Sequence, residues 1–276
     1  MYKILKKEAL SEQVKLMVID APLVARKAQP GQFIILRINE QGERIPLTIA
    51  DFDAEAGTVT IIFQEVGKTT IHLGTLNEGD SLLDFVGPLG KPSHFESGIK
   101  KAAVIGGGLG TAIAYPQAKK LHSLGVSVTS ITGFRTKDLI LLEKEIGAVS
   151  DKLLVMTDDG SNGHKGFVTD ALKSEIEAGE KFDLVIAIGP LIMMKFVSKL
   201  TKEYGINTIV SMNPIMIDGT GMCGGCRVTV GGRTQFACVD GPDFDGHEVD
   251  FDEAIRRSAM YKLQQEDSCN LFREVK

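Results

Sequence analysis

The N-terminal third of the chain carries short apolar stretches without a long helical period. Glycine begins or ends these stretches, as in GQFIILRI (31–38), GTVTIIF (57–63) and GDSLLDFVG (79–87). Short apolar segments bounded by glycine indicate strands joined by turns. Several such strands in so short a length predict a small antiparallel β-barrel over residues 1–96.

From about residue 101 onward, apolar runs alternate with segments of helical spacing, which is typical of parallel strands with covering helices. The predicted strands are 102–105, 126–132, 152–157, 183–189 and 207–212, and the predicted helices are a stretch ending at 124, then 136–146, 166–179 and 190–205. This pattern predicts a doubly wound parallel α/β domain over residues 97–212. Residues 213–276 are rich in loops, apart from helical spacing at 253–265, and predict a small extension that needs a ligand or a neighbour to hold it.

Composition narrows the class of protein. With 276 residues, 43% of them hydrophobic, the chain predicts about two domains at ~150 residues each. The net charge of −5 lacks the basic surplus of a nucleic-acid binder. No apolar run reaches the ~20 residues of a membrane span, and the charged N-terminus does not resemble a signal peptide. We therefore expect a cytoplasmic protein with no nucleic-acid partner and no membrane span. The acidic run 240–253 is typical of a solvated face, with partner docking as the alternative.

Three of the four cysteines crowd into residues 223–238, and in a reducing compartment such spacing indicates chemistry rather than disulfides. The pattern is D-x4-C-x2-C-x11-C, which matches plant-type iron–sulfur spacing with aspartate in the first position. It predicts a [2Fe–2S] site with the ligands Asp218, Cys223, Cys226 and Cys238. A zinc site with the same donors remains an alternative. Cys269 is a second alternative, as fourth ligand, although an incidental thiol is the preferred interpretation.

A glycine-rich turn, GGGLGTA at 106–112, follows a predicted strand and opens a predicted helix. Glycine there lets the backbone approach a pyrophosphate, which the helix N-terminus attracts. The third glycine of the usual fingerprint is missing, and Arg135 stands near the place of the usual acid, so NAD and NADP both remain possible. TDDGS at 157–161 ends another strand, where either a ligand or a turn explains it. The candidate nucleotide-binding residues are Gly106, Gly107, Gly108, Gly110, Thr111, Arg135 and Asp159.

Two further segments, RIPLT (44–48) and GKTT (67–70), combine basic side chains, hydroxyls and a glycine. Such groups can hold a pyrophosphate. From these residues alone, polar loops of the barrel are the preferred interpretation.

The order of these motifs resembles the ferredoxin reductase-like electron-transfer subunits. This family includes the iron–sulfur flavoprotein subunit of dihydroorotate dehydrogenase. The segments NPIMIDGTGMCGGCRV and FACVDGPDFDGHEVDFD are more similar to the small subunits of NADH-dependent ferredoxin:NADP oxidoreductase, also described as sulfide dehydrogenase beta subunits. Asp218 separates the two groups, because the dihydroorotate group carries cysteine there. The resemblance covers essentially the whole chain.

The resemblance implies three cofactors: FAD, NAD(H) and the [2Fe–2S] cluster. A flavin connects the two-electron chemistry of a nicotinamide to the one-electron chemistry of the cluster, so we expect no catalytic acid or base. The implied flavin-binding residues are Arg44, Ile45, Pro46, Leu47, Thr48, Ile62, Phe63, Gln64, Gly67, Lys68, Thr69 and Thr70.

The implied partner is a larger subunit with FAD and [4Fe–4S] clusters that binds NADP(H) and ferredoxin, giving an electron-bifurcating heterodimer. The alternatives are the electron-transfer subunit of dihydroorotate dehydrogenase and, in a different class, a zinc-stabilised nucleotide-binding regulator.

Overall fold

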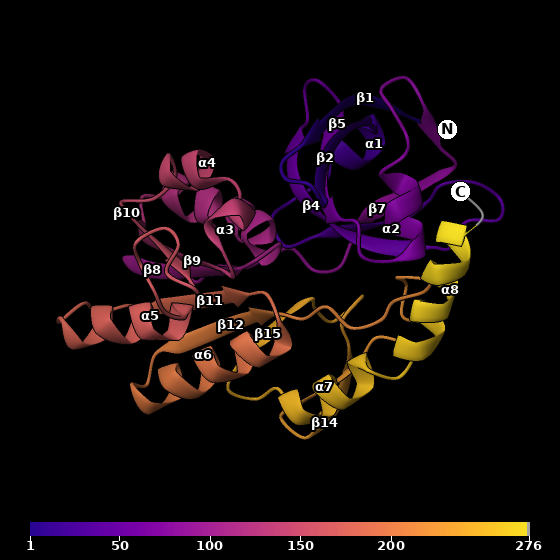
Figure 1. The fold of residues 1–276 in the computed structure, drawn as a ribbon. Helices are drawn as coiled ribbons and strands as arrows, with labels where there is room; N and C mark the ends of the chain where they lie inside the picture. Colours follow the sequence, from indigo (N-terminus) through magenta and orange to yellow (C-terminus); the bar gives the residue numbers. More distant parts are fainter. Residues whose placement is uncertain (275–276) are drawn as a thin grey trace.

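The N-terminal part of the molecule is an antiparallel sheet that curls into a barrel beside the α/β part (Figure 1). The computed structural model describes residues 1–274, and in this part the sheet has seven strands in the order β6-β1-β2-β5-β4-β3-β7. Its strands are β1 Tyr2–Ala9, β2 Val14–Asp20, β3 Phe33–Arg37, β4 Ile45–Asp53, β5 Thr58–Gln64, β6 Ser81–Leu82 and β7 Asp84–Leu89. Two short helices accompany the sheet, α1 Pro22–Ala25 and α2 Lys68–Leu73.

Alternate residues of these strands point inward and form the barrel core. Met17, Ile61 and Phe63 are fully buried there. The sequence pattern did not identify β1 or β2. It also placed RIPLT in a loop, whereas most of that segment belongs to β4, so the loop interpretation was wrong. The reason is Pro46, because a proline within an apolar run argues against a strand that has neighbours on both sides, as β4 does.

The second sheet carries helices on both faces, as the doubly wound prediction requires. Its order is β10-β9-β8-β11-β12-β15, and within residues 1–274 it has six strands, of which only β15 is antiparallel to its neighbour. The strands are β8 Lys101–Gly107, β9 Ser127–Phe134, β10 Lys152–Thr157, β11 Leu184–Ile188, β12 Asn207–Ser211 and β15 Asp243–Asp245, and the main helices are α3 Gly110–Ser123, α5 Val168–Glu177 and α6 Leu191–Glu203.

Alternation along β8 shows how the sheet is covered. Ala102 and Val104 pack in the cluster that includes α3, whereas Ala103 and Ile105 pack in the cluster that includes α5 and α6. The fold class predicted from the sequence is therefore confirmed. The helix expected over 136–146 is instead split into η1 Lys137–Leu139 and α4 Glu143–Gly147, because Leu142 between them has a φ of 54° that a continuous helix does not allow.

The C-terminal segment returns to both sheets. It forms a hairpin, β13 Arg227–Val230 with β14 Arg233–Phe236, and then adds β15 to the edge of the second sheet. The helical spacing at 253–265 belongs to two helices, α7 Phe251–Ser258 and α8 Lys262–Glu274.

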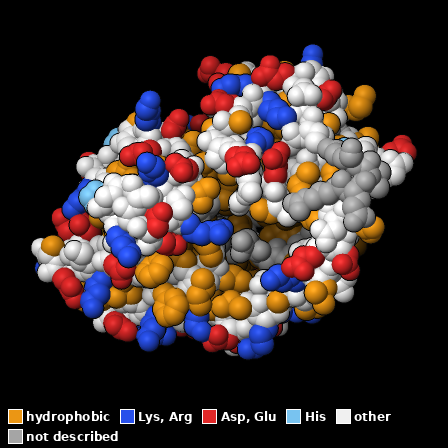
Figure 2. Space-filling model, in the orientation of Figure 1, with side chains coloured by type: hydrophobic (Ala, Val, Ile, Leu, Met, Phe, Trp, Pro, Cys, Tyr) orange, Lys and Arg blue, Asp and Glu red, His pale blue; other side chains and the backbone are white. Residues whose placement is uncertain are grey.

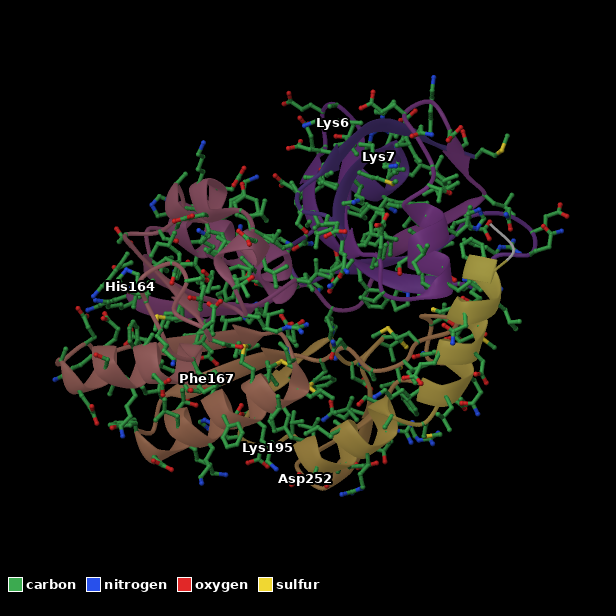
Figure 3. The ribbon with its side chains drawn as sticks, in the orientation of Figure 1. Lys6, Lys7, His164, Phe167, Lys195 and Asp252 are labelled. Atoms are coloured by element: carbon green, nitrogen blue, oxygen red, sulfur yellow. The ribbon has the colours of Figure 1, made fainter. Side chains whose placement is uncertain are left out.

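Contacts fasten this segment at several points. Lys195 of α6 and Asp252 of α7 face one another with Nζ and Oδ1 2.6 Å apart (Figure 3). Helix α8 reaches the barrel, where the rings of Phe272 and His72 lie 5.7 Å apart. The predicted boundaries 1–96, 97–212 and 213–276 remain predictions, and residues 275–276 lie outside the described residues. A search of residues 1–274 for a helix long and apolar enough to cross a membrane finds none.

Candidate cofactor cavity and metal-binding loop

A cavity of about 1030 Å³ lies between the barrel and the second sheet, at the carboxyl ends of the parallel strands. Open α/β sheets bind their ligands at this edge. Figure 2 shows the molecule hollowed between the two parts. Seven of the predicted site residues line the cavity: Pro46, Thr48, Gln64, Gly107, Gly108, Gly110 and Arg135.

The glycine-rich turn has no room for a side chain at Gly107 or Gly110. A Cβ on Gly107 would lie 2.4 Å from the sulfur of Met193, and one on Gly110 would lie 2.3 Å from the carbonyl oxygen of Ile188. The start of α3 therefore lies against the end of β11, and its first residue, Gly110, lines the cavity together with Leu109. Gly106 and Thr111 pack beneath the turn, since a Cβ on Gly106 would lie 2.7 Å from the Cα of Thr111. Among the described residues, the buried Thr111 hydroxyl has no hydrogen-bond partner.

Other predicted residues lie outside the cavity wall. Phe63 has no exposed surface and belongs to the barrel core, so its ring cannot touch a cofactor. The exposed Asp159 accepts hydrogen bonds from the hydroxyl and the backbone N–H of Ser161 at 2.6 and 2.9 Å, which lower the pKa of its carboxyl. Those bonds favour the turn interpretation of TDDGS, and the preceding residue, Asp158, lines the cavity instead. Four further flavin candidates, in or directly before β4 and in β5, also lie outside the cavity wall. Arg44 is exposed, Ile45 and Leu47 are partly buried, and Ile62 is buried.

The segment Gly67–Thr70 begins the short helix α2. The Thr70 hydroxyl accepts hydrogen bonds from the N–H groups of Val66 and Gly67, at 3.1 and 3.0 Å. The Thr69 hydroxyl donates to Glu43, and Lys68 is exposed. The two hydroxyls thus already have local partners. The prediction that this segment closes on a pyrophosphate stays a prediction.

Several cavity residues were missed by the sequence analysis. Phe134 and Asp158 follow the pattern that could have found them, since they stand at or directly after the ends of β9 and β10. Phe167, just before α5, and Phe196 of α6 line the mouth of the cavity and expose 62% and 53% of their surface (Figure 3 labels Phe167). Two exposed aromatic rings at a cavity mouth suit the stacking of a flat ring system.

The four predicted metal ligands form two pairs. The Cys223 sulfur lies 3.3 Å from Oδ1 of Asp218, and the Cys226 sulfur lies 3.2 Å from the Cys238 sulfur. Backbone N–H groups of Gly225 and Cys238 point at the sulfurs of Cys223 and Cys226, both at 3.4 Å. Such donors stabilise negative charge on ligating sulfur. Cys226 and Cys238 are buried, whereas Cys223 is exposed.

The pKa values of Asp218 and Cys238 shift in opposite directions. Partial burial alone would raise the pKa of Asp218, but hydrogen bonds from Thr220 and Cys223 outweigh it and lower that pKa to about 2. Burial, together with the neighbouring Cys226, raises the pKa of Cys238 to about 12. A thiol of this kind gives up its proton only to a strongly binding metal ion. The Asp218 carboxylate is therefore ready to bind a cation, and the Cys238 thiol needs one to ionise.

The donors come in pairs. In a [2Fe–2S] cluster each iron takes two protein ligands, so four donors arrive as two pairs. The pairing of Asp218 with Cys223 and of Cys226 with Cys238 therefore fits a two-iron cluster.

The loop between β12 and β13, residues 212–226, carries the first three metal donors, and we call it the metal-binding loop. It lies against the barrel. Gly219 follows the first donor with a φ of +75°, and a Cβ there would come within 2.8 Å of Leu89 and 2.9 Å of Ile35. Ile35 shares a face of β3 with Phe33, which lines the cavity, and residues two apart on a strand are separated by about 7 Å. The loop and the cavity thus touch the same short piece of β3.

Cys269 does not join the donor pairs. Its buried sulfur lies 4.0 Å from the carbonyl oxygen of Val66, where α8 packs on the barrel. This position supports the interpretation of Cys269 as a packing thiol.

Comparison with known proteins agrees with this architecture. Residues 213–250 match the iron–sulfur cluster binding domain of dihydroorotate dehydrogenase B. A Thermotoga maritima protein described as a homologue of the dihydroorotate dehydrogenase B (NAD(+)) electron transfer subunit is 49% identical over 98% of this chain and 95% of its own length. The chain belongs to this family of electron-transfer subunits. The probable subunit of that kind from Methanocaldococcus jannaschii is 36% identical over 93% of each chain.

One solved structure is similar over nearly the whole molecule. It belongs to the NADH-dependent reduced ferredoxin–NADP oxidoreductase, studied for flavin-based electron bifurcation. It matches 99% of this chain and 98% of its own with a TM-score of 0.93 and 48% identity. The predicted membership in the ferredoxin reductase-like family is therefore confirmed, and so, for the family, are the iron–sulfur, flavin and NAD(H) classes of cofactor.

Proposed function

We propose that this chain is the NAD(H)-linked subunit of an NADH-dependent ferredoxin:NADP oxidoreductase and carries FAD and a [2Fe–2S] cluster. The observation that carries the proposal is the course of residues 211–226. Ser211, Met212 and Met216 line the cavity, and Asp218, the first metal donor, follows two residues later. When bound, the flavin supplies the conversion between the two-electron chemistry of the nicotinamide and the one-electron chemistry of the cluster.

The residues of this chain would bind the flavin and the nucleotide and orient them. Pro46, Thr48 and Gln64 approach the cavity from the barrel and are our proposed contacts for the flavin ring. The turn at Gly107 and Gly108 brings the start of α3 to the cavity, where Leu109 and Gly110 line it, and the N-terminus of a helix favours the negative charge of a nucleotide pyrophosphate. The remaining predicted contacts of the barrel, from Arg44 through Thr70, stay part of the proposal.

We also propose NAD(H) rather than NADP(H) as the nucleotide. Arg135 and Asp158 both line the cavity at neighbouring strand ends, where the N–H of Asp158 donates to the carbonyl of Phe134 at 3.0 Å. A carboxylate beside the arginine offsets its attraction for a 2′-phosphate and can accept a ribose hydroxyl. In an Asp158→Ala variant, the ratio of kcat/KM for NADPH to that for NADH should rise. An unchanged ratio would remove Asp158 from the choice of nucleotide.

The proposed partner is a larger subunit with FAD and [4Fe–4S] clusters that takes NADP(H) and ferredoxin, where bifurcation itself takes place. The metal-binding loop supports docking, because Met222 and Ile217 beside the donors expose 89% and 55% of their surface. Large exposed apolar side chains at one site are typical of interfaces. The cytoplasmic location stays a prediction.

A second candidate function is electron transfer to a dihydroorotate dehydrogenase. The match of residues 213–250 to that enzyme's cluster domain favours it. Asp218 counts against it, because the dihydroorotate group carries cysteine at this position.

The proposal is tested by anaerobic co-purification and metal analysis. The native complex should contain two irons and two sulfides in this subunit, and the subunit alone should oxidise NADH with an artificial acceptor. A partner that reduces NADP⁺ with ferredoxin supports the first function, and a partner that oxidises dihydroorotate supports the second. Zinc in place of iron, in colourless protein handled without air, would exclude both.

A further inference from the structure

Four polar side chains meet behind the cavity wall, and we call them the junction cluster: Ser93, Gln117, Ser211 and Asp243. Ser93 lies in the connection between β7 and β8, Gln117 on α3, Ser211 at the end of β12, and Asp243 at the start of β15. The Gln117 amide donates to the Ser93 hydroxyl, and that hydroxyl donates to Oδ2 of Asp243, both at 2.5 Å. Ser211 pairs with Asp243 across the two strands, and both Ser211 and Gln117 lie close enough to the Asp243 carboxyl to lower its pKa.

Two oxygens of this cluster lack a donor. Within residues 1–274, Oδ1 of Asp243 and Oε1 of Gln117 are both shielded from solvent and have no hydrogen-bond partner, although the rest of the Asp243 residue is partly exposed. A buried acceptor without a donor costs the desolvation of that group. Neither oxygen can satisfy the other, since both only accept while the carboxyl is ionised.

One proton satisfies both oxygens. If Oδ1 of Asp243 carries it, this oxygen donates to Oε1 of Gln117, and a closed ring results: amide to hydroxyl, hydroxyl to carboxyl, and carboxyl back to amide. Burial raises the pKa of Asp243, and the bonds from Ser93, Ser211 and Gln117 lower it only in part. The three groups that act on the carboxyl are uncharged. The next carboxylate on the same strand, Asp245, accepts the N–H of His247 at 2.9 Å.

The ring stands where the parts of the molecule join. The N–H of Ser93 donates to Pro30 of the barrel at 2.9 Å, and the N–H of Lys91 donates to Gly241 at 2.7 Å. Gly31, with a φ of +85°, lies so close that a Cβ would come 2.1 Å from the Ser93 hydroxyl oxygen. Pro242, directly before Asp243, lines the cavity together with Ser211.

We propose that Asp243 is a neutral carboxylic acid that closes a hydrogen-bond ring with Gln117 and Ser93, and that this ring is a positioning element for the cavity wall. It holds the barrel, the second sheet and the segment that follows the metal donors at fixed spacing. The ring uses only this chain's own side chains, so its existence does not depend on the identity of the electron acceptor.

The first experiment tests whether the Asp243 carboxyl carries a proton. Asp243→Asn keeps the ring, because its amide group can donate to Gln117 and its oxygen can accept from Ser93. The infrared difference between wild type and Asp243→Asn at pH 7 should contain the carbonyl band of a protonated carboxylic acid, and Asp20→Asn, at an exposed site, should give only carboxylate bands. A difference without the acid band would overturn the proposal.

The second experiment tests whether the stability of the folded protein falls or rises with pH. The unfolded chain ionises Asp243 above pH ~4, whereas the folded chain retains the proton, so the wild type loses stability as pH rises towards the raised pKa. The thermal midpoint of Asp243→Asn should therefore exceed that of the wild type by a margin that grows from pH 5 to pH 8. A variant that is less stable by a constant amount would show an ionised Asp243 and refute the ring.

The third experiment tests positioning. Ser93→Ala opens the ring, and we expect it to raise the KM for NADH by up to ~100-fold, whereas Asp243→Asn should retain the wild-type KM. This comparison rests on the proposed function, while the infrared and unfolding measurements do not, so failure of one is distinguishable from failure of the other. A folded Ser93→Ala variant with wild-type KM would refute the positioning role. If that variant does not fold, Gln117→Ala takes its place.

Discussion

Gly110→Ala should damage nucleotide binding without touching the nucleotide. Gly110 is the first residue of α3 and lies against the end of β11. An added Cβ would stand 2.3 Å from the carbonyl oxygen of Ile188 and 2.8 Å from the Cα of Gly189, where ordinary contact begins at 3.4 Å. Both obstacles are backbone, so no side chain can rotate away, and the start of the helix must move.

The size of the effect follows from these distances. Restoring contact at the nearer atom takes a shift of about 1 Å, from 2.3 to 3.4 Å. Forcing one extra methyl into a packed site costs about 1–3 kcal/mol, and the helix propensity of alanine returns less than ~1 kcal/mol. A net loss near 1–2 kcal/mol lowers the thermal midpoint by several degrees, at ~2–4 °C per kcal/mol. The same shift displaces Gly107 and Gly108, and a 1 Å misplacement can cost up to ~100-fold in rate.

The assay is steady-state NADH oxidation by an artificial acceptor, together with thermal unfolding. We expect the KM for NADH to rise at least ~10-fold, the equivalent of 1.4 kcal/mol. Gly147→Ala in α4 is the matched control, since a Cβ there meets nothing nearer than 3.7 Å; it should leave the KM unchanged and should not lower the midpoint. Wild-type KM and midpoint in Gly110→Ala would refute the argument that close packing of α3 on β11 shapes the site.

The other predictions concern the donors and the arginine. Cys226→Ser should lose most of the bound iron, whereas Cys269→Ser should retain it, as measured by iron content and visible absorption. The reverse result would show that Cys269 is a ligand and that Cys226 is not. Asp218→Cys should keep a cluster with stronger visible absorption, because a thiolate replaces a carboxylate, while Asp218→Ala should lower the iron content; equal iron in both would exclude Asp218 as a ligand. Arg135→Ala should raise the KM for NADH ~10-fold with little change in kcat, since a charged hydrogen bond contributes ~1.5–3 kcal/mol; an unchanged KM would exclude contact with the nucleotide.

The sequence predicted best where a residue's role depends on its neighbours in the chain. The spacing from Asp218 to Cys238 identified four donors that the fold brings into two pairs. The glycines at 107, 108 and 110 were found because glycines between a strand and a helix are a sequence pattern of nucleotide-binding turns, although Met193 and the carbonyl of Ile188 are what leave no room for a side chain at 107 and 110. Local spacing in the sequence was sufficient in both cases.

The prediction was weaker where tertiary packing decides. Phe63 has the right sequence position for a cofactor contact, yet the inward face of β5 buries its ring in the barrel core. Asp158 and Asp159 are equivalent in sequence, and only the turn closed by Ser161 determines which of them faces the cavity. The edge strand β15 was missed because it has only three residues, DFD, and its pairing with β12 depends on the fold rather than on an apolar run.

The position of β15 explains why the segment that follows the donors returns to the second sheet at all. The loop that carries Asp218 and Cys223 is rich in glycine and contacts the barrel at Gly219. Without a further anchor, such a loop would not fix the distance between the metal donors and the cavity. Pairing of Ser211 with Asp243 fixes both ends of the intervening stretch on adjacent strands. Because Met212 and Pro242 line the cavity from those two ends, a change in the register of β15 would move the cavity wall and the donor loop together. The short pairing of β15 with β12 thus ties the cavity wall to the segment that follows the metal donors.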